Sequence, residues 1–148
     1  MFSFLQSSSP KSVIISLYET DDLGRVDRVS GKLDLKTHDR NTYQQLKAGK
    51  TDGIIDGLEA DEGGHLIASI FDGPGEQINY SAMNGNLNKG AWKQLENKWS
   101  DALKEGKTVD VDIRQVFKGS SKRPDRFIVK HTIDGVEEVS ILRNKPGG

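Results

Sequence analysis

Four side chains between positions 65 and 96 are of the types used in metal-assisted hydrolysis: His65, Asn79, Asn88 and Glu96. A histidine titrates near neutral pH, so a neutral His65 could take a proton from water, which typically contributes about 10²- to 10⁴-fold to a rate. Two glycines, Gly63 and Gly64, precede it and would let backbone and substrate approach closely. Because a single histidine more often makes an ordinary structural hydrogen bond, the hypothesis depends on its companions.

Asn88 is the candidate metal ligand, since its amide oxygen suits a hard cation such as Mg²⁺, which prefers oxygen ligands in octahedral geometry. A neutral ligand would leave the charge of the ion available to polarise a phosphate, as Lewis-acid catalysis requires. The alternative is that Asn88 caps a helix that begins near Lys89 or Gly90.

Glu96 lies eight residues after Asn88. On an ideal helix this spacing is about 80° around and roughly 12 Å along the axis, too far for both side chains to bind one ion directly. Glu96 is therefore predicted to hold a metal-bound water or to orient a ligand, and the alternative is a solvated surface glutamate. Asn79 is predicted to orient Asn88, the attacking water or a phosphate, unless it only stabilises its own loop.

The stretch from His65 to Glu96, with LNKGAW at positions 87–92, resembles the DNA/RNA non-specific endonucleases, which are ββα-metal (His-Me finger) nucleases. It is most similar to small members at the C-terminal ends of bacterial polymorphic toxins, which SKRPDRF at 121–127 also resembles. The resemblance covers roughly residues 14–142. It implies that His65 is the base, that Asn88 binds Mg²⁺, or Mn²⁺ in its place, and that Glu96 and Asn79 match the family's outer-shell glutamate and additional asparagine.

Arg40 is the candidate catalytic and phosphate-binding arginine, because Arg40-Asn41 matches an Arg-Asn pair that precedes the histidine in larger family members. The residue types alone indicate only a solvated surface charge there. Larger members also carry an arginine two residues before the histidine, where this chain has Gly63. Arg40, Lys89 and Lys93 are therefore the candidates to contact the phosphate.

The net charge of −1 argues against a protein that coats nucleic acid through bulk electrostatics. An enzyme that releases its product needs only a local cationic groove. The basic run Lys122, Arg123, Arg126 and Lys130 could flank a nucleic-acid backbone, although charge runs are more often plain solvated faces.

Two alternatives compete with the nuclease hypothesis. In the first, the acidic residues Asp56, Glu59, Asp61 and Glu62 form a different hydrolytic metal site with His65, although their spacing matches no known motif. In the second, the chain is a non-catalytic, β-rich binding module, which predicts that DNA stays intact in the presence of Mg²⁺.

The 148 residues predict one domain, large enough to bury a core without metal or disulfide support. The absence of cysteine excludes disulfides and thiolate metal sites, and no run approaches the ~20 apolar residues of a membrane span. We expect a disordered or cloning-derived lead at 1–11, a single nuclease domain at 12–144 and a flexible tail at 145–148.

Alternating apolar and polar residues predict strands, and apolar residues at i, i+3, i+4 spacing predict one helix closed by Gly106. The Asp134-Gly135 pair marks a tight hairpin. We expect strands at 12–19, 25–35, 108–117, 126–133 and 136–143, an extended segment at 65–71, a helix from about 90 to 104, a loop at 79–88, and a longer loop at 36–60 with one helical turn near 43–46. The predicted fold is α+β, with a central antiparallel β-sheet and a ββα-metal element at about 62–104.

The resemblance implies a Mg²⁺-dependent endonuclease that cleaves DNA, RNA or both without strong sequence preference. Water activated by His65 would attack phosphorus while the metal bound by Asn88 neutralises the 3′ oxygen, leaving a 5′ phosphate. By the same resemblance, the chain is the toxic part of a secreted bacterial toxin that acts in the cytoplasm of a target cell. An immunity protein that blocks the groove is then the expected partner in producing cells.

Overall fold

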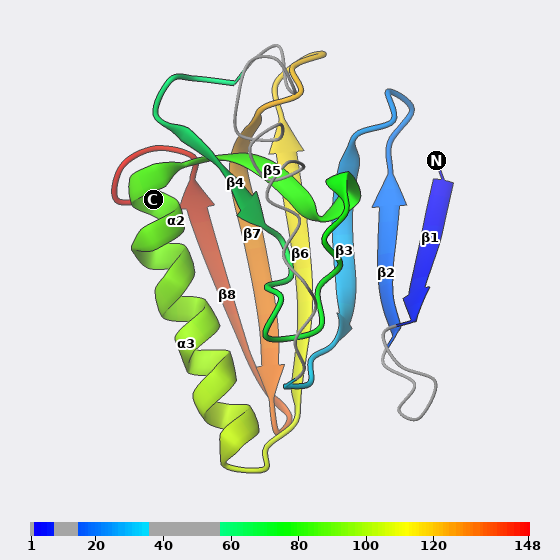
Figure 1. The fold of residues 1–148 in the computed structure, drawn as a ribbon, viewed down its shortest axis with the longest axis vertical. Coiled ribbons are helices and arrows are strands. Elements are labelled where there is room, and N and C mark those ends of the chain that lie inside the picture. Colours follow the sequence, from blue (N-terminus) through cyan, green and yellow to red (C-terminus); the bar gives the residue numbers. More distant parts are fainter. Residues whose placement is uncertain (1, 8–14, 36–56) are drawn as a thin grey trace.

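The computed structural model describes residues 2–7, 15–35 and 57–148. This part of the chain forms a six-stranded antiparallel sheet of order β1-β2-β3-β6-β7-β8, a two-stranded sheet β4-β5 and two consecutive helices (Figure 1). The large sheet comprises β1 (Phe2–Ser7), β2 (Ile15–Thr20), β3 (Val26–Lys32), β6 (Val109–Phe117), β7 (Pro124–Ile133) and β8 (Val136–Arg143). The remaining elements are β4 (Asp61–His65), the 3₁₀ turn η1 (Gln77–Asn79), β5 (Tyr80–Asn84), α2 (Gly85–Lys89) and α3 (Ala91–Lys104).

The large sheet is half-buried, as the alternating sequence pattern predicts. Val109, Val111 and Ile113 of β6 turn toward the core while the residues between them face outward. Ile113 pairs with Val29 of β3 on one side and Val129 of β7 on the other, and all three side chains are buried. The inner face of the sheet therefore supplies a continuous aliphatic layer for the helix to cover.

Helix α3 lies against the sheet and covers this layer (Figure 1). Its two tryptophans, Trp92 and Trp99, are fully buried, and the Trp92 ring meets Phe127 of β7 edge to face at 5.0 Å. The helix ends before Gly106, whose φ of +81° favours glycine. The prediction of this helix and its stop is confirmed.

The C-terminal hairpin also matches the prediction. Asp134 and Gly135 both have positive φ, 46° and 83°, as a two-residue turn of the I′ kind requires. Strands β7 and β8 pair in register from Ile133 and Val136 at the turn to Arg126 and Arg143 at the other end.

The predicted extended segment at 65–71 was wrong. The strand lies earlier, at Asp61–His65, and residues 66–71 form bends and turns. Leu66, Ile67 and Phe71 are nevertheless fully buried, because the turn tucks them into the main core. Their apolar side chains therefore indicate burial in the core and not the alternating pattern of a strand.

The predicted loop at 79–88 was also wrong, since it holds β5 and α2. The side chain of Asn84 accepts hydrogen bonds from the backbone nitrogens of Asn86 and Leu87, at 3.0 and 3.2 Å, and so caps α2. Asparagines that look like loop formers in the sequence thus start a helix. Together β4, β5, α2 and α3 form the predicted ββα element, with the α+β fold class.

Strand β1 lies within residues 1–11, where the sequence predicts no regular structure, and it pairs with β2. The predicted helical turn near 43–46 lies outside the described residues, as do residues 12–14 of the first predicted strand. Among the helices of the described part, none has the length and apolar character needed to cross a membrane.

Candidate active site

His65 is the last residue of β4 and pairs with Tyr80, the first residue of β5. Its ring lies against the Tyr80 ring, with centroids 4.7 Å apart and planes tilted by 47°, and the residue stays partly exposed. This contact fixes the imidazole on one side while its residue remains accessible to solvent. Gly64 serves packing, because a Cβ there would lie 3.0 Å from the Met83 side chain. This close contact explains the need for glycine without an approaching substrate.

Asn88 lies in the body of α2, across from β4. Its side-chain nitrogen Nδ2 donates a hydrogen bond of 2.9 Å to Oε2 of Glu62. With Nδ2 held in this way, the other end of the amide, Oδ1, accepts no hydrogen bond from a described residue. The alternative role of Asn88 as a helix cap was wrong, since Asn84 caps α2 and Gly90 stands before α3.

The structure brings Glu62 beside Asn88, a contact that the sequence did not predict. The Oε1 atom of Glu62 also forms an ion pair of 2.6 Å with the ammonium of Lys89. Burial alone would raise the pKa of Glu62, but the hydrogen bonds from Lys89 and Asn88 and the charge of Lys89 lower it below its ordinary value. Glu62 is therefore ionised at neutral pH and holds two consecutive residues of α2 in place.

The acidic cluster of the first alternative does not form in the described part of the chain. Asp61 and Glu62 are neighbours in a strand, so their side chains point to opposite faces of the two-stranded sheet. Glu59 is exposed and Asp56 lies outside the described residues. No group of three or more histidine, cysteine, aspartate or glutamate side chains that could hold a metal occurs among the described residues.

The structure contradicts the predicted contact between Asn79 and a substrate. The Asn79 side chain is 0% exposed. Oδ1 accepts hydrogen bonds from the Tyr18 hydroxyl at 3.0 Å and the Ile67 backbone nitrogen at 2.9 Å. Nδ2 donates to the backbone oxygens of Ile67 and Pro74, at 2.6 and 3.0 Å. These four bonds use both ends of the amide, so Asn79 shapes the chain behind His65 and does not reach a substrate.

Glu96 lies on the buried side of α3 and is 7% exposed. Asn88 and Glu96 belong to different helices, so the single-helix estimate of their separation does not apply. The break falls at Gly90, where a Cβ would lie 2.8 Å from the Asn86 backbone oxygen. A glutamate this well buried is rarely an ordinary surface charge, which argues against the solvated alternative.

The three cationic candidates for the phosphate contact differ in their position. Arg40 lies outside the described residues. The Lys89 side chain is 75% exposed although its ammonium pairs with Glu62, and it borders Asn88 directly. Lys93 is exposed on α3 and forms no ion pair with a described residue. Gly63, where larger relatives carry an arginine, is buried in β4 opposite Ala82.

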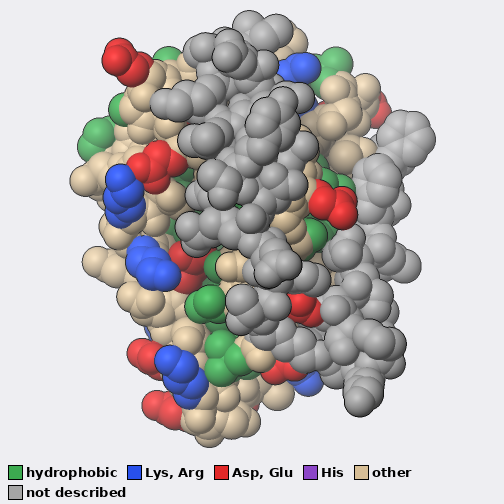
Figure 2. Space-filling view, in the orientation of Figure 1, with side chains coloured by type: hydrophobic (Ala, Val, Ile, Leu, Met, Phe, Trp, Pro, Cys, Tyr) green, Lys and Arg blue, Asp and Glu red, His purple; other side chains and the backbone are tan. Residues whose placement is uncertain are grey.

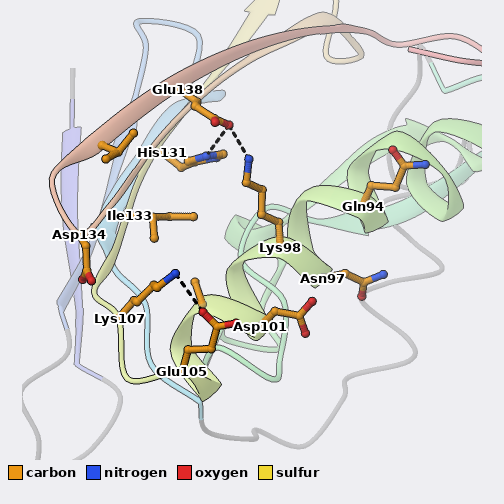
Figure 3. A pocket seen from close by; sticks show the side chains of 12 residues that line it. Gln94, Asn97, Lys98, Asp101, Glu105, Lys107, His131, Ile133, Asp134 and Glu138 are labelled. Carbon is orange, nitrogen blue, oxygen red and sulfur yellow. Dashed lines mark hydrogen bonds and ion pairs between the residues drawn. The ribbon is translucent and has the colours of Figure 1, made fainter.

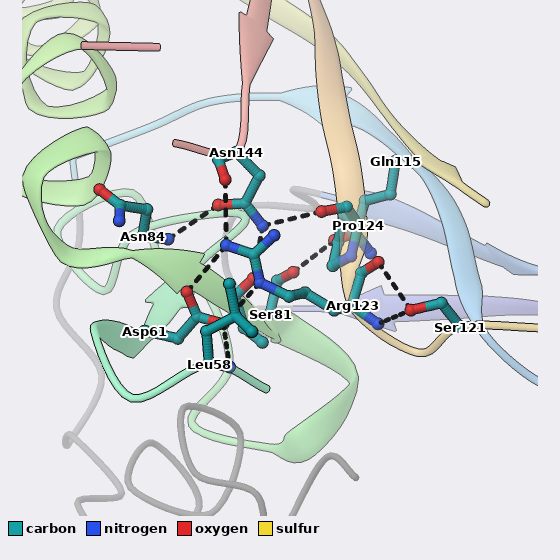
Figure 4. Close-up of polar contacts among 10 residues, drawn as sticks. Leu58, Asp61, Ser81, Asn84, Gln115, Ser121, Arg123, Pro124 and Asn144 are labelled. Atoms are coloured by element: carbon teal, nitrogen blue, oxygen red, sulfur yellow. Dashed lines mark hydrogen bonds and ion pairs between the residues drawn. The ribbon is translucent and has the colours of Figure 1, made fainter. Parts of the chain in front are cut away.

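The ββα element is attached to the large sheet by a buried polar network (Figure 4). Arg123 donates from Nε and Nη2 to the two carboxylate oxygens of Asp61, at 2.7 and 2.9 Å, and the Asp61 side chain is 0% exposed. Arg123 Nη2 also donates to the backbone oxygen of Asn144, at 3.0 Å. Arg123 of the predicted basic run is thus a structural residue that holds the start of β4.

Asn144 and Ser81 make further links between the two sheets. The Asn144 side chain accepts from the Asn84 backbone nitrogen at 2.7 Å and donates to the backbone oxygens of Ala82 and Pro124, at 2.9 and 2.8 Å. The Ser81 hydroxyl donates to the Gln115 side chain at 2.6 Å (Figure 4). These bonds fix β5, and with it the orientation of α2, relative to the sheet.

His131 has a structural role. It is 1% exposed, its Nδ1 accepts from Trp99 Nε1 at 3.0 Å, and its Nε2 lies 3.1 Å from Glu138 Oε2. Burial lowers the pKa of His131 below its ordinary value, against the opposing effect of Glu138. It lines a cavity of about 670 Å³ between α3 and the β7–β8 hairpin, where Lys98 pairs with Glu138 (Figure 3).

Most of the chain matches a family model and curated relatives. The family model described as DNA/RNA non-specific endonuclease matches residues 7–135. The type VII secretion system protein EssD of Staphylococcus aureus (strain USA300) is 35% identical over 136 residues, which are 87% of this chain and 22% of that protein. The chain thus spans about a fifth of the length of the curated relatives it matches.

Solved structures share the fold at low sequence identity. NucA from Streptococcus agalactiae, crystallised with a bound magnesium ion, aligns with a TM-score of 0.69 and 12% identity over 95% of this chain and 76% of that chain. The Sda1 nuclease with a bound zinc ion aligns with a TM-score of 0.67 and 16% identity over 99% and 85% of the two chains. The chain therefore shares its overall fold with these two nucleases.

Proposed function

The chain belongs to the DNA/RNA non-specific endonuclease family, and from this premise we propose that it hydrolyses phosphodiester bonds at His65 with the help of a divalent cation held by Asn88. The observation that carries the proposal is the hydrogen bond from Asn88 to Glu62, which orients the amide of Asn88. Glu62 lies in β4, the strand that ends at His65, so both proposed functional residues belong to one ββα element.

The residues around Asn88 fit a hard cation. Its Nδ2 donates to Glu62, so the oxygen Oδ1 is the end of the amide left for an ion. The ionised carboxylate of Glu62 adds negative charge beside it and can accept hydrogen bonds from metal-bound water. When bound, the ion would supply Lewis-acid stabilisation of the phosphate and of the departing 3′ oxygen. Oxygen donors without thiolate or a histidine cluster favour Mg²⁺, with Mn²⁺ as a substitute.

His65 acts as the general base in this proposal. Its neutral imidazole takes a proton from a water molecule, and the oxygen of that water attacks phosphorus in line with the 3′ oxygen. The bond between phosphorus and the 3′ oxygen breaks, the 3′ oxygen gains a proton from solvent, and the phosphate stays on the 5′ oxygen of the following nucleotide. The Tyr80 ring holds the imidazole from one side, so that little orientation remains to be fixed when substrate binds.

Lys89 is the described cation best suited to hold the phosphate. It follows Asn88 directly, and its pairing with Glu62 keeps the ammonium beside the proposed ion site. Lys93 lies at the start of α3, after the break at Gly90, and would contact the backbone next to the cleaved bond. Arg40 stays a prediction for the same role. Glu96, buried on α3, would orient water around the ion.

The relative EssD is by name a type VII secretion system protein, and this chain matches about a fifth of its length. We therefore propose that the chain is the nuclease part of a secreted toxin that acts in the cytoplasm of a target cell. Such a toxin requires a cognate immunity protein in the producing cell, which would cover the site at His65 and Asn88.

The test is cleavage of plasmid DNA and total RNA by the purified chain, with Mg²⁺ and with EDTA. His65→Ala should abolish cleavage without shifting the thermal unfolding transition. Asn88→Ala should weaken cleavage in a way that extra Mg²⁺ or Mn²⁺ partly restores, and Glu96→Gln should be milder. Asn97→Ala, which removes an exposed asparagine of α3, is the matched control and should retain full activity.

Two results would contradict the proposal. Full cleavage by His65→Ala would remove His65 from the role of base. Intact DNA and RNA with wild-type protein in Mg²⁺ and in Mn²⁺ would favour the alternative of a non-catalytic binding module.

A further inference from the structure

A cationic cavity lies at the end of the large sheet, where the loop after β6, the start of β7 and the end of β8 meet. Its volume is about 420 Å³. Five of its lining residues are cationic and one is acidic: Lys118, Arg123, Arg126, Arg143, Lys145 and Asp125. We call this group the β8-end cavity. None of these cations takes part in the proposed hydrolysis.

The charge of the β8-end cavity is only partly compensated. Arg123 is neutralised by the buried Asp61. Asp125 lies 3.2 Å from Lys118 and 3.9 Å from Arg126, and it is shared between them. Arg143 and Lys145 form no ion pair with a described residue, so the cavity keeps a net excess of about three positive charges at neutral pH.

This excess is local, because the chain as a whole has a net charge of −1. On the visible part of the face that carries α3, Lys and Arg side chains are interspersed with Asp and Glu side chains (Figure 2). A concentration of one sign of charge in a hollow raises the local concentration of anions.

Two arginines of the cavity lie opposite each other, and their repulsion destabilises the protein when no anion is bound. Arg126 and Arg143 stand directly opposite each other across β7 and β8, and like charges in this position are destabilising. The sheet contains a second such pair, Arg28 opposite Arg114, but there Asp112 binds Arg28 at 2.7 Å. In the Arg126–Arg143 pair the acid is weaker, because Asp125 lies 3.9 Å from Arg126 and is shared with Lys118, and Arg143 forms no ion pair with a described residue. An anionic ligand would supply the missing charge.

Resting on the proposed function, we propose that the β8-end cavity binds backbone phosphates of the nucleic-acid substrate several nucleotides away from the cleaved bond. The wall residue Arg123 contacts Asp61 at the start of β4, and His65 ends that strand. Four strand rises separate them, roughly 13 Å. This distance corresponds to about four base-pair steps of duplex DNA. The lining offers cations and no aromatic ring, so it recognises phosphate and not base sequence.

The test is binding of a fluorescent duplex of about 20 base pairs in EDTA, measured by anisotropy between 50 and 300 mM salt. Arg143→Ala/Lys145→Ala should reduce the slope of log K against log salt by about 1.8, or roughly 60-fold in affinity at 0.1 M salt if counterion release dominates. Lys32→Ala/Lys104→Ala removes the same charge from exposed positions elsewhere and should leave the slope nearly unchanged.

An equal loss of slope in both double variants would overturn the subsite, because only net charge would then matter. No loss in either would overturn it as well, because the cations of the β8-end cavity would then contribute nothing to binding. Swapping the charges conservatively, in Arg143→Lys/Lys145→Arg, should keep the wild-type slope. Plasmid cleavage in Mg²⁺ is measured in parallel. A chain that binds with these slopes but never cleaves would refute the proposed function and leave the phosphate subsite standing.

Discussion

Replacing Arg123 should cause a large and localised loss of stability. The Asp61 carboxylate is 0% exposed and accepts hydrogen bonds from Arg123 Nε and Nη2 and from the Leu58 backbone nitrogen at 2.8 Å. Arg123→Ala leaves this charge buried with one donor. Breaking a buried pair in this way costs about 3–5 kcal/mol. Since each 1 kcal/mol lowers Tm by about 2–4 °C in a chain of this size, the expected fall is roughly 10 °C.

Urea unfolding of Arg123→Ala, Asp61→Ala and the double variant would measure the effect. The double variant leaves no charge uncompensated, so its loss should be smaller than the sum of the single losses by about 1–3 kcal/mol. Arg126→Ala is the matched control, because that arginine is three residues away and exposed, and its effect should stay within about 0.5 kcal/mol. Amide hydrogen exchange should show the greatest acceleration in β4.

A loss below about 1 kcal/mol in Arg123→Ala, or additive losses in Asp61→Ala and Arg123→Ala, would refute the role of Arg123 as the partner that compensates the buried Asp61 charge. Either result would mean that water enters the site and solvates the carboxylate. The attachment of β4 to the large sheet would then depend on Asn144 and Ser81, the other side chains that join the two sheets.

Three further predictions concern single side chains. Asn79→Ala should cost about 2–4 kcal/mol in urea unfolding, because four buried partners lose their hydrogen bonds, while a substrate contact would instead lower activity at unchanged stability. Glu62→Gln should reduce Mg²⁺-dependent cleavage by about 10- to 100-fold, with partial recovery at high Mg²⁺, since Asn88 loses its charged partner; unchanged activity would contradict this. Burial lowers the pKa of His131, so the unfolded chain binds that proton more readily and stability should fall as pH drops below about 6.5. Urea unfolding near pH 7.5 and 5.5 should show a smaller pH effect in His131→Gln, and an equal effect would exclude His131 as its source.

Much of the fold could be predicted from short-range patterns. The apolar spacing of α3, the alternation of β6 to β8 and the Asp134-Gly135 turn are local properties, and the structure confirms each of them. The predictions failed where burial overrode the local pattern. Leu66 and Ile67 are buried in a turn, and the asparagines before Asn88 lie in η1, at the N-cap of α2 and within α2.

The candidate site shows the same division. The residue types at His65, Asn88 and Glu96 and their likeness to a nuclease family were readable without coordinates. Their neighbours were not, because Glu62 meets Asn88 across 26 residues of sequence and Arg123 meets Asp61 across 62. Such partners depend on sheet pairing and on side-chain direction, which no local pattern contains.

The sequence by itself determined the family, the helix that follows Asn88 and the strands of the C-terminal half, since these follow from motif, periodicity and turn chemistry within a few residues. The tertiary structure alone decided that Asn79 is buried in the core and that Asn84 caps α2. It also separated the basic run into Arg123, whose charge is bound by the buried Asp61, and Arg126, which lies exposed in the wall of the same cavity. The physical reason is that burial and pairing arise only when distant strands come together, so equal residue types acquire different roles.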